Sequence, residues 1–193
     1  MILKSDNKAL HWEVLESEYL HHEPWLTVRK ERLQLPNGTI ASDYYVLEYA
    51  NWVNIIAVTR EKKFILVKQY RHGIGQVCYE LCAGVCEKYD QSPLESAKRE
   101  LMEETGYGNG RWSEFITLSP NASANTNLSY CFIAEDVEKI NDQALEESED
   151  LSVHLFHIFS NKTVGEVGLC TCVGRESDEF TPSPVPVAGL LHQ

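Results

Sequence analysis

Apolar positions in the first half of the chain come in short runs that predict strands. Val53–Thr59 and Phe64–Tyr70 are nearly continuous apolar runs separated by a short polar segment. Runs of this length indicate two central strands joined by a tight turn. Upstream, the extended segments Trp25–Leu35 and Tyr44–Ala50 flank a Pro-Asn-Gly sequence, which favours a turn. This pair therefore predicts a β-hairpin.

The segment that carries the signals of a helix is Pro93–Thr105. Ser92 suits the N-cap, and Glu95 is placed three residues later, where it closes a capping box. Proline is favoured in the first helical turn, and Gly106 suits the position just past the last turn. The pattern therefore predicts one amphipathic helix after the strands.

The second half of the chain is less regular. Ser129–Ala134 and Ser152–Phe159 have the apolar content of strands, and the acidic stretch between them reads as a helix or an exposed loop. From about Thr163 onward, glycine and proline interrupt every periodic pattern, which predicts an irregular tail.

Composition narrows the class of protein. The chain has 193 residues, 43% of them hydrophobic and 24% charged, which is typical of a globular protein of one domain or two small ones. A net charge of −12 argues against a nucleic-acid backbone as partner, since such a partner requires a basic face. No apolar run approaches the roughly 18 residues of a membrane span, and the first residues lack the order of a signal peptide. A cytoplasmic protein that binds neither membrane nor nucleic acid is the simplest interpretation.

Three glutamates on the predicted helix form the first candidate site. Leu94, Ala97 and Leu101 make its apolar stripe, and the flank beside this stripe carries Glu100, Glu103 and Glu104. Carboxylates at these spacings converge and repel one another unless a positive charge neutralises them. A run of charges on a helix is usually a solvated face, but a hard cation such as Mg²⁺ or Mn²⁺ would also resolve the repulsion.

The wider context of these glutamates resembles the Nudix box. In residues 84–107, the run Arg99-Glu100-Leu101-Met102-Glu103-Glu104-Thr105-Gly106-Tyr107 matches every fixed position of that pattern. Two departures lie in the loop before the helix. The loop has one extra residue, and Gln91 stands where the family has glutamate, with Asp90 next to it as a possible substitute.

Two further segments are similar to the ADP-ribose pyrophosphatase branch of this family. Gln69-Tyr70-Arg71 resembles its Q-[YF]-R segment, and Glu80-Leu81-Cys82-Ala83-Gly84 resembles its E-x-P-A-G segment, with Cys82 in place of proline. The resemblance implies an α/β fold, the Nudix α/β/α sandwich, with a mixed sheet and an N-terminal antiparallel β-region. It also implies a homodimer in which that β-region helps to build the partner's substrate site.

We therefore divide the chain into an N-terminal β-region (1–50), a Nudix domain (51–160) and an irregular tail (161–193). The resemblance assigns metal ligation to Glu100 and Glu104, with Glu103 as a further ligand or base. It adds the carbonyl of Ala83 as another ligand, in what we interpret as a turn of small residues after a strand.

Three other residues are candidates for the site. Arg99 lies four residues before Glu103, where it can orient the glutamates or partly compensate their charge. The resemblance suggests roles for the other two. Arg71 is placed to meet a phosphate or the terminal ribose, with a surface ion pair as the alternative. Trp25 resembles the aromatic residue that stacks on the nucleobase, with ordinary strand packing as its alternative.

The general base is not identified by these motifs. In related enzymes it often comes from a late loop, but the matching loop here, Ser119–Asn127, contains no carboxylate. Glu103 or Glu100 would then serve, or an acid from Glu146–Asp150.

The expected activity is Mg²⁺-dependent hydrolysis of a nucleoside diphosphate linked to a sugar. ADP-ribose, giving AMP and ribose 5-phosphate, is the favoured small-molecule substrate. The alternatives are another nucleotide sugar such as GDP-mannose, a dinucleotide, or a Nudix domain that senses a nucleotide without cleaving it.

Overall fold

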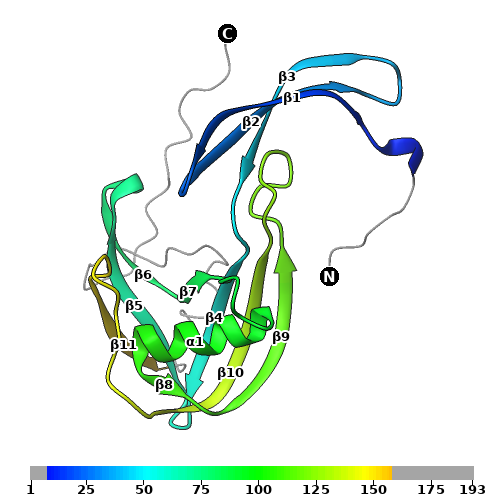
Figure 1. The fold of residues 1–193 in the computed structure, drawn as a ribbon. Helices are drawn as coiled ribbons and strands as arrows, with labels where there is room; N and C mark the ends of the chain where they lie inside the picture. Colours follow the sequence, from blue (N-terminus) through cyan, green and yellow to red (C-terminus); the bar gives the residue numbers. More distant parts are fainter. Residues whose placement is uncertain (1–7, 158–193) are drawn as a thin grey trace, which may run out of the picture.

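The computed structural model describes residues 8–157, which form two β-sheets and one α-helix (Figure 1). In chain order the elements are η1 (Lys8–Leu10), β1 (Glu13–Glu23), β2 (Leu26–Gln34), β3 (Ile40–Glu48), β4 (Trp52–Thr59), β5 (Lys63–Arg71), η2 (His72–Ile74), β6 (Gln76–Glu80), β7 (Cys82–Val85), α1 (Pro93–Thr105), β8 (Tyr107–Gly108), β9 (Arg111–Leu118), β10 (Ser129–Lys139) and β11 (Leu151–His157). The predicted tail lies outside the described residues.

The N-terminal sheet has the antiparallel order β1-β2-β3. The predicted hairpin is confirmed as β2 and β3, which meet at a turn where Gly38 adopts φ +83°. That conformation is readily accessible to glycine, which explains the Asn-Gly signal. β1 is exposed over nearly its whole length.

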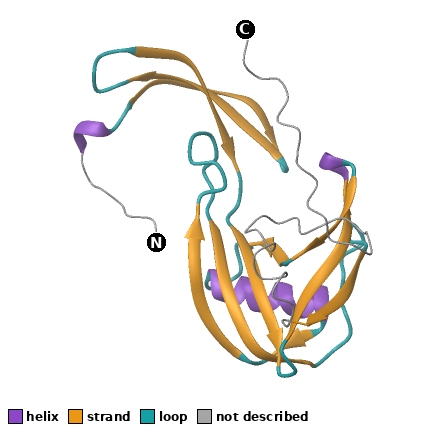
Figure 2. Cartoon of the chain, turned by 180° about the vertical axis from the view of Figure 1, so that it is seen from behind, coloured by secondary structure: helices purple, strands orange, loops and turns teal. Residues whose placement is uncertain are grey.

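The main sheet has the order β11-β5-β4-β10-β8, and β6, β7 and β9 pair with β5, β4 and β10 respectively. β4 and β10 run parallel and the other pairs are antiparallel, so the sheet is mixed. α1 lies against one face of this sheet (Figure 2). The core between them is built from Val53, Ile55, Ala57, Ile65, Cys82, Ala97, Leu101, Phe132, Ala134 and Val137.

Both central strands are confirmed as β4 and β5, because the alternate residues of β4 that face α1 are buried. The helix is confirmed as α1, and Ser92 Oγ accepts the N–H of Glu95 (3.3 Å). The expected reciprocal contact of the capping box differs, since the Glu95 carboxylate pairs with Lys98 (2.9 Å). Gly106 ends the helix at φ +70°.

Two predictions need correction. The small residues after Glu80 are not a turn, because Cys82–Val85 form β7 and pair with β4, with Ala83 opposite Asn54. For the acidic stretch, which was predicted as a helix or an exposed loop, the helix is wrong and the loop is largely confirmed. Its first residues extend β10 to Lys139, where pairing with β9 and β8 continues, and the rest is loop.

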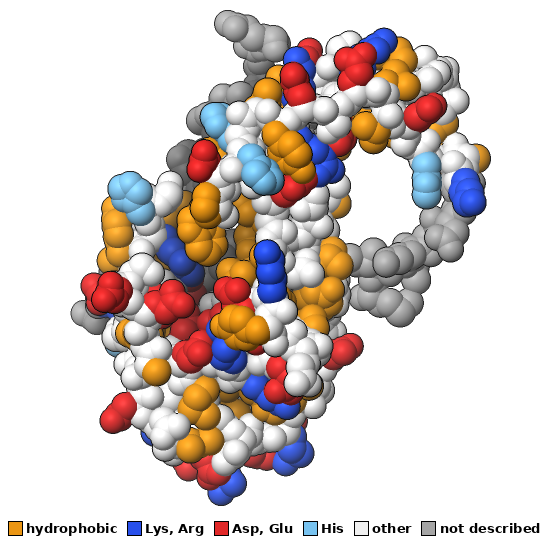
Figure 3. Space-filling model, viewed as in Figure 1, with side chains coloured by type: hydrophobic (Ala, Val, Ile, Leu, Met, Phe, Trp, Pro, Cys, Tyr) orange, Lys and Arg blue, Asp and Glu red, His pale blue; other side chains and the backbone are white. Residues whose placement is uncertain are grey.

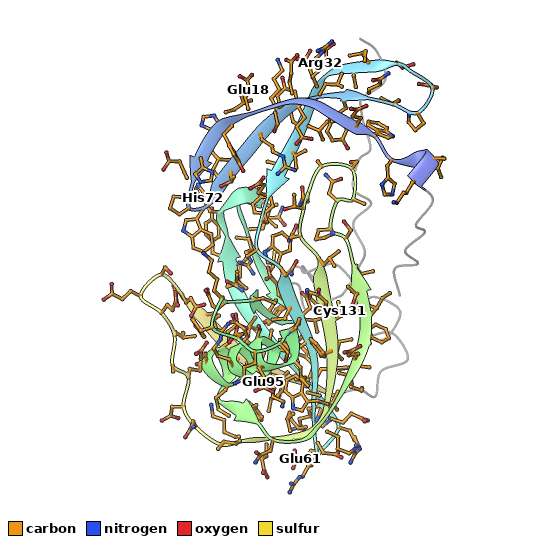
Figure 4. The ribbon with its side chains drawn as sticks, turned by 45° about the vertical axis from the view of Figure 1, so that its right-hand side comes forward. Glu18, Arg32, Glu61, His72, Glu95 and Cys131 are labelled. Atoms are coloured by element: carbon orange, nitrogen blue, oxygen red, sulfur yellow. The ribbon has the colours of Figure 1, made fainter. Side chains whose placement is uncertain are left out.

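The two sheets are linked by the loop between β9 and β10. The backbone of Leu47 donates to Ala124 O (2.8 Å) and accepts from Thr126 N (3.0 Å), and Tyr44 Oη donates to Ser123 O. Figure 4 shows Glu18 and Arg32 on the N-terminal sheet and Glu61 at the far end of the main sheet. None of the helices found in residues 8–157 is long and apolar enough to cross a membrane.

Candidate functional site

Arg99 is the centre of a polar network between α1 and the segment that follows β7. Its guanidinium donates to Asp90 Oδ2 (3.1 Å), to Glu100 Oε1 (3.0 Å) and to Glu103 Oε2 (2.9 Å). It also donates to the carbonyl of Val85 (2.9 Å). One side chain thus connects the end of β7, the following loop and two glutamates of the helix.

Asp90, the residue before Gln91, supplies an acidic contact from the loop to Arg99. Gln91 itself stands where the family has glutamate. The Asp90 carboxylate is 7% exposed, bonds to Arg99, and accepts the N–H of Glu87 (3.0 Å). The hydrogen bond from Arg99 holds the pKa of Asp90 below its usual range. Gln91 is exposed. The extra loop residue is therefore accommodated by an acid one position earlier.

Glu100 lies against Gly84. A Cβ on Gly84 would come within 1.9 Å of Glu100 Cδ, so this strand position leaves room for the carboxyl group only when it is glycine. Burial raises the pKa of Glu100 to about 7 against the opposing effect of Arg99, and the charges of Glu103 and Glu149 add to the rise.

Glu104 approaches the same strand from one turn further along α1. Its Oε2 accepts the N–H of Ala83 (3.3 Å), and the residue is 4% exposed. Burial raises its pKa to about 7, and the negative charges of Glu100 and Glu149 contribute. Two buried carboxylates therefore converge on the backbone of β7.

Glu103 does not join this pair. Its side chain is 41% exposed and its carboxylate pairs with Arg99. Accordingly, no three His, Cys, Asp or Glu side chains within residues 8–157 are grouped closely enough to hold a metal ion. The pair Glu100 and Glu104, with the nearby backbone of Ala83, nevertheless offers oxygen ligands, which suit a hard divalent cation.

A pocket of about 640 Å³ opens beside these carboxylates. Its walls come from β4, β5, η2 and β7, and it is lined by Trp52, Val53, Asn54, Tyr70, Arg71, His72, Gly73, Ile74, Ala83, Gly84 and Val85. Figure 3 shows acidic side chains gathered between α1 and β7 beside a hollow in the surface. The pocket reaches the carboxylates through Ala83 and Gly84, the β7 residues that Glu104 and Glu100 contact.

Arg71 lines this pocket and forms an ion pair, which is the alternative considered for it, while its contact with a phosphate or ribose stays a prediction. Its Nη2 donates to Glu80 Oε2 (2.6 Å), and Glu80 is 1% exposed. The buried carboxylate of Glu80 therefore fixes the direction of the Arg71 guanidinium.

Trp25 is not among the residues that line the pocket. It is 82% exposed in the turn between β1 and β2. The turn between β1 and β2 lies beside η2 (Figures 1 and 4). η2 contains His72, which is labelled in Figure 4, and contributes to the pocket. Sequence reasoning assigned no role to the aromatic residues Trp52 and Tyr70, although Tyr70 belongs to the segment that resembles Q-[YF]-R.

The loop between β9 and β10 contributes no acid, as its sequence indicates. It contains Asn127, which is 1% exposed and whose amide nitrogen and oxygen both lack a hydrogen-bond partner. The acidic segment before β11 is different, since the charge of Glu149 acts on both buried glutamates of α1. The negative charge of the acidic segment thus acts on the carboxylates, whereas the asparagine-rich loop carries no acid.

Comparison with known proteins defines the family. Residues 49–164 match the NUDIX domain model, and residues 12–47 match the model of the nucleoside diphosphate sugar hydrolase N-terminal domain. The chain therefore belongs to the Nudix family, and the predicted family resemblance is confirmed.

Named relatives agree with this membership. The chain is 29% identical over 147 residues to an ADP-ribose pyrophosphatase of Bacillus subtilis, covering 76% of this chain and 78% of the relative. It is 30% identical over 118 residues to a GDP-mannose pyrophosphatase of Enterobacter sp., covering 56% and 60%. A solved structure of an ADP compounds hydrolase superposes with a TM-score of 0.65 at 22% identity, over 76% of this chain and 78% of that one. This superposition confirms the predicted fold class.

Proposed function

We propose that this protein hydrolyses the diphosphate of a nucleoside diphosphate linked to a sugar, with Mg²⁺ or Mn²⁺ as cofactor and ADP-ribose as substrate. The observation that carries the proposal is the pair of buried glutamates, Glu100 and Glu104, beside a pocket that also contains Arg71. A divalent cation held next to a pocket that is lined by an arginine suits a diphosphate, which carries negative charge on both phosphates.

Glu100, Glu104 and the carbonyl of Ala83 would hold the cation. When bound, it supplies charge stabilisation at the phosphate oxygens and acidifies water. Arg71 binds a phosphate oxygen and is held in direction by Glu80. Arg99 keeps Glu100 in place and draws Glu103 away from the cation. Water attacks one phosphorus, its proton passes to a carboxylate, and the bridging P–O bond breaks to release AMP and ribose 5-phosphate.

Glu149 is the carboxylate best suited to accept that proton. Glu103 is engaged by Arg99, and Glu100 is committed to the cation in this scheme. Glu149 is half-buried and close enough to raise the pKa of both Glu100 and Glu104. This supports the third of the sequence-based alternatives, an acid from the segment before β11.

The N-terminal β-region (1–50) is proposed as a dimerisation element next to the Nudix domain (51–160). Its sheet exposes large apolar side chains, among them Val14, Tyr19, Leu20, Trp25, Leu26, Ile40 and Tyr45. Apolar exposure on this scale favours contact with a second copy of the chain. In such a homodimer Trp25 would stack on the nucleobase in the partner's pocket, and the enzyme would work in the cytoplasm.

A second nucleotide sugar remains a specific alternative, since one relative is a GDP-mannose pyrophosphatase. The pocket has two aromatic residues, Trp52 and Tyr70, which could stack on either purine. A dinucleotide and a non-catalytic nucleotide-sensing role are the remaining alternatives.

The decisive experiment is a substrate panel of ADP-ribose, GDP-mannose and a dinucleotide, each assayed with Mg²⁺, with Mn²⁺ and with EDTA. We expect fastest release of AMP from ADP-ribose and no release with EDTA. Faster turnover of GDP-mannose would make GDP-mannose, and not ADP-ribose, the preferred substrate. Binding without turnover of any compound would favour the sensing role. Size measurement by light scattering tests the dimer.

A further inference from the structure

The C-terminal end of α1 is capped by the last residue of β10 and by the segment that follows this strand. Helix ends leave four carbonyl groups without helical partners. Here Lys139 Nζ donates to the carbonyl of Thr105 (2.9 Å), and Gln143 Nε2 donates to the carbonyl of Glu104 (2.6 Å). The N–H of Ala144 donates to the carbonyl of Glu103 (2.9 Å).

Two of these bonds join the acidic loop to the residues that carry the site. Gln143 binds the backbone of Glu104, and Ala144 binds the backbone of Glu103. Figure 1 shows this segment rising past the C-terminal end of α1 before the chain turns back down into β11. Any shift of the loop at this point would move it relative to the buried carboxylates.

Beyond this anchor the chain forms a compact acidic turn. The N–H of Glu149 donates to the carbonyl of Glu146 (3.0 Å), and Glu149 Oε2 accepts the N–H of Glu146 (2.9 Å). Leu151 is buried and opens β11 opposite Gln69. The turn is therefore held between two fixed points, the α1 anchor at residues 143–144 and the first residue of β11.

We propose that Gln143 is a positioning residue for the reaction. By tying the acidic turn to the backbone of Glu104, it sets how far Glu149 reaches over the carboxylates of α1. The inference rests on the proposed function, in which Glu149 accepts the proton from water. Gln143 touches neither substrate nor the reacting atoms in this scheme, and it acts through Glu149.

Gln143 is well placed for a clean test. It lies in an exposed part of the loop, so replacing it opens no core cavity. Gln143→Met keeps the length of the side chain and removes the N–H donor, whereas Gln143→Lys keeps a donor that the helix C-terminus favours. The neighbouring exposed residue Asp142 provides a matched control as Asp142→Asn.

The kinetic test uses ADP-ribose with Mg²⁺. Because small displacements of a reacting group are costly, we expect Gln143→Met to lower kcat about tenfold with KM unchanged, and Gln143→Lys and Asp142→Asn to stay within about threefold of wild type. In a Glu149→Gln background, Gln143→Met should lower kcat less than about twofold further. A full additional loss in that background, or a wild-type kcat for Gln143→Met, would overturn the proposal.

Hydrogen exchange of the metal-free protein gives a readout that does not depend on activity. In Gln143→Met we expect faster exchange of amides in residues 145–150, with the protection of α1 beyond its last turn unchanged. Unchanged exchange in residues 145–150 would contradict the tether. If wild type hydrolyses nothing in the panel, the proposed function fails, and this measurement alone still decides whether Gln143 holds the acidic turn.

Discussion

The carboxylate of Glu100 occupies the space where a side chain at position 84 would stand. A Cβ added to Gly84 would lie 1.9 Å from Glu100 Cδ and within 2.3 Å of both oxygens of the Glu100 carboxylate. Glycine at this position is therefore a requirement of the site, since it permits a buried glutamate to lie directly on β7.

Gly84→Ala should displace the Glu100 carboxylate and weaken cation binding. Because Gly84 is in a strand and its φ is not positive, the backbone tolerates alanine, and the effect falls on the glutamate. We expect loss of metal-dependent turnover by roughly 100-fold or more, since a ligand displaced by an ångström or more costs this much. Calorimetric titration with Mn²⁺ measures binding directly.

Gly73→Ala is the matched control for the effect of an added methyl group on folding. A Cβ at Gly73 would meet no atom within 4 Å, so its thermal unfolding temperature should equal that of wild type. If Gly84→Ala bound Mn²⁺ with wild-type affinity, Glu100 would not be a ligand of the cation.

The pair of Asp90 and Arg99 leads to a second prediction. Asp90→Ala removes a partner of a largely buried arginine, while Gln91 is exposed. We expect Asp90→Ala to lower the melting temperature by roughly 5–10 °C, as broken buried ion pairs do, and to reduce turnover. Gln91→Ala should change neither property. The opposite ranking of these two variants would show that Gln91 carries the loop contact after all.

Sequence patterns predicted the parts of the fold that depend on local signals. Ser92 and Gly106 bound α1 because capping is a property of adjacent residues. The strand character of Cys82–Val85 was missed because small residues also favour turns, and pairing with β4 decides between the two.

The part of the candidate site that depends on local spacing could also be predicted from the sequence, and the rest could not. Glu100 and Glu104 follow from helical spacing, whereas the capture of Glu103 by Arg99 depends on a guanidinium that reaches four acceptors at once. The proximity of Glu149 could not be read from spacing, since it depends on how the β10–β11 loop folds back against α1.

Glu104→Gln tests the second carboxylate of the site. The substitution keeps the shape of the side chain and an oxygen that can accept the N–H of Ala83, but it removes the charge. We expect metal-dependent turnover of ADP-ribose to be lost while the metal-free protein folds with at least the wild-type melting temperature. Turnover at the wild-type rate by this variant would contradict the metal assignment.

The same two glutamates predict how the stability of the metal-free protein depends on pH. Burial raises the pKa of Glu100 and of Glu104 from an ordinary 4.5 to about 7, so the folded state binds protons more tightly than the unfolded state. The resulting contribution to stability is fully present below pH 4.5 and is lost as the pH rises through about 7.

In EDTA, the melting temperature of wild type should therefore fall relative to that of Glu104→Gln as the pH is raised across this range. Mg²⁺ should restore the wild-type value most strongly at the alkaline end, where both carboxylates are ionised, and should have little effect on the variant. A difference between the two proteins that does not change with pH, measured by thermal unfolding in matched buffers, would show that Glu104 is already ionised in the metal-free fold.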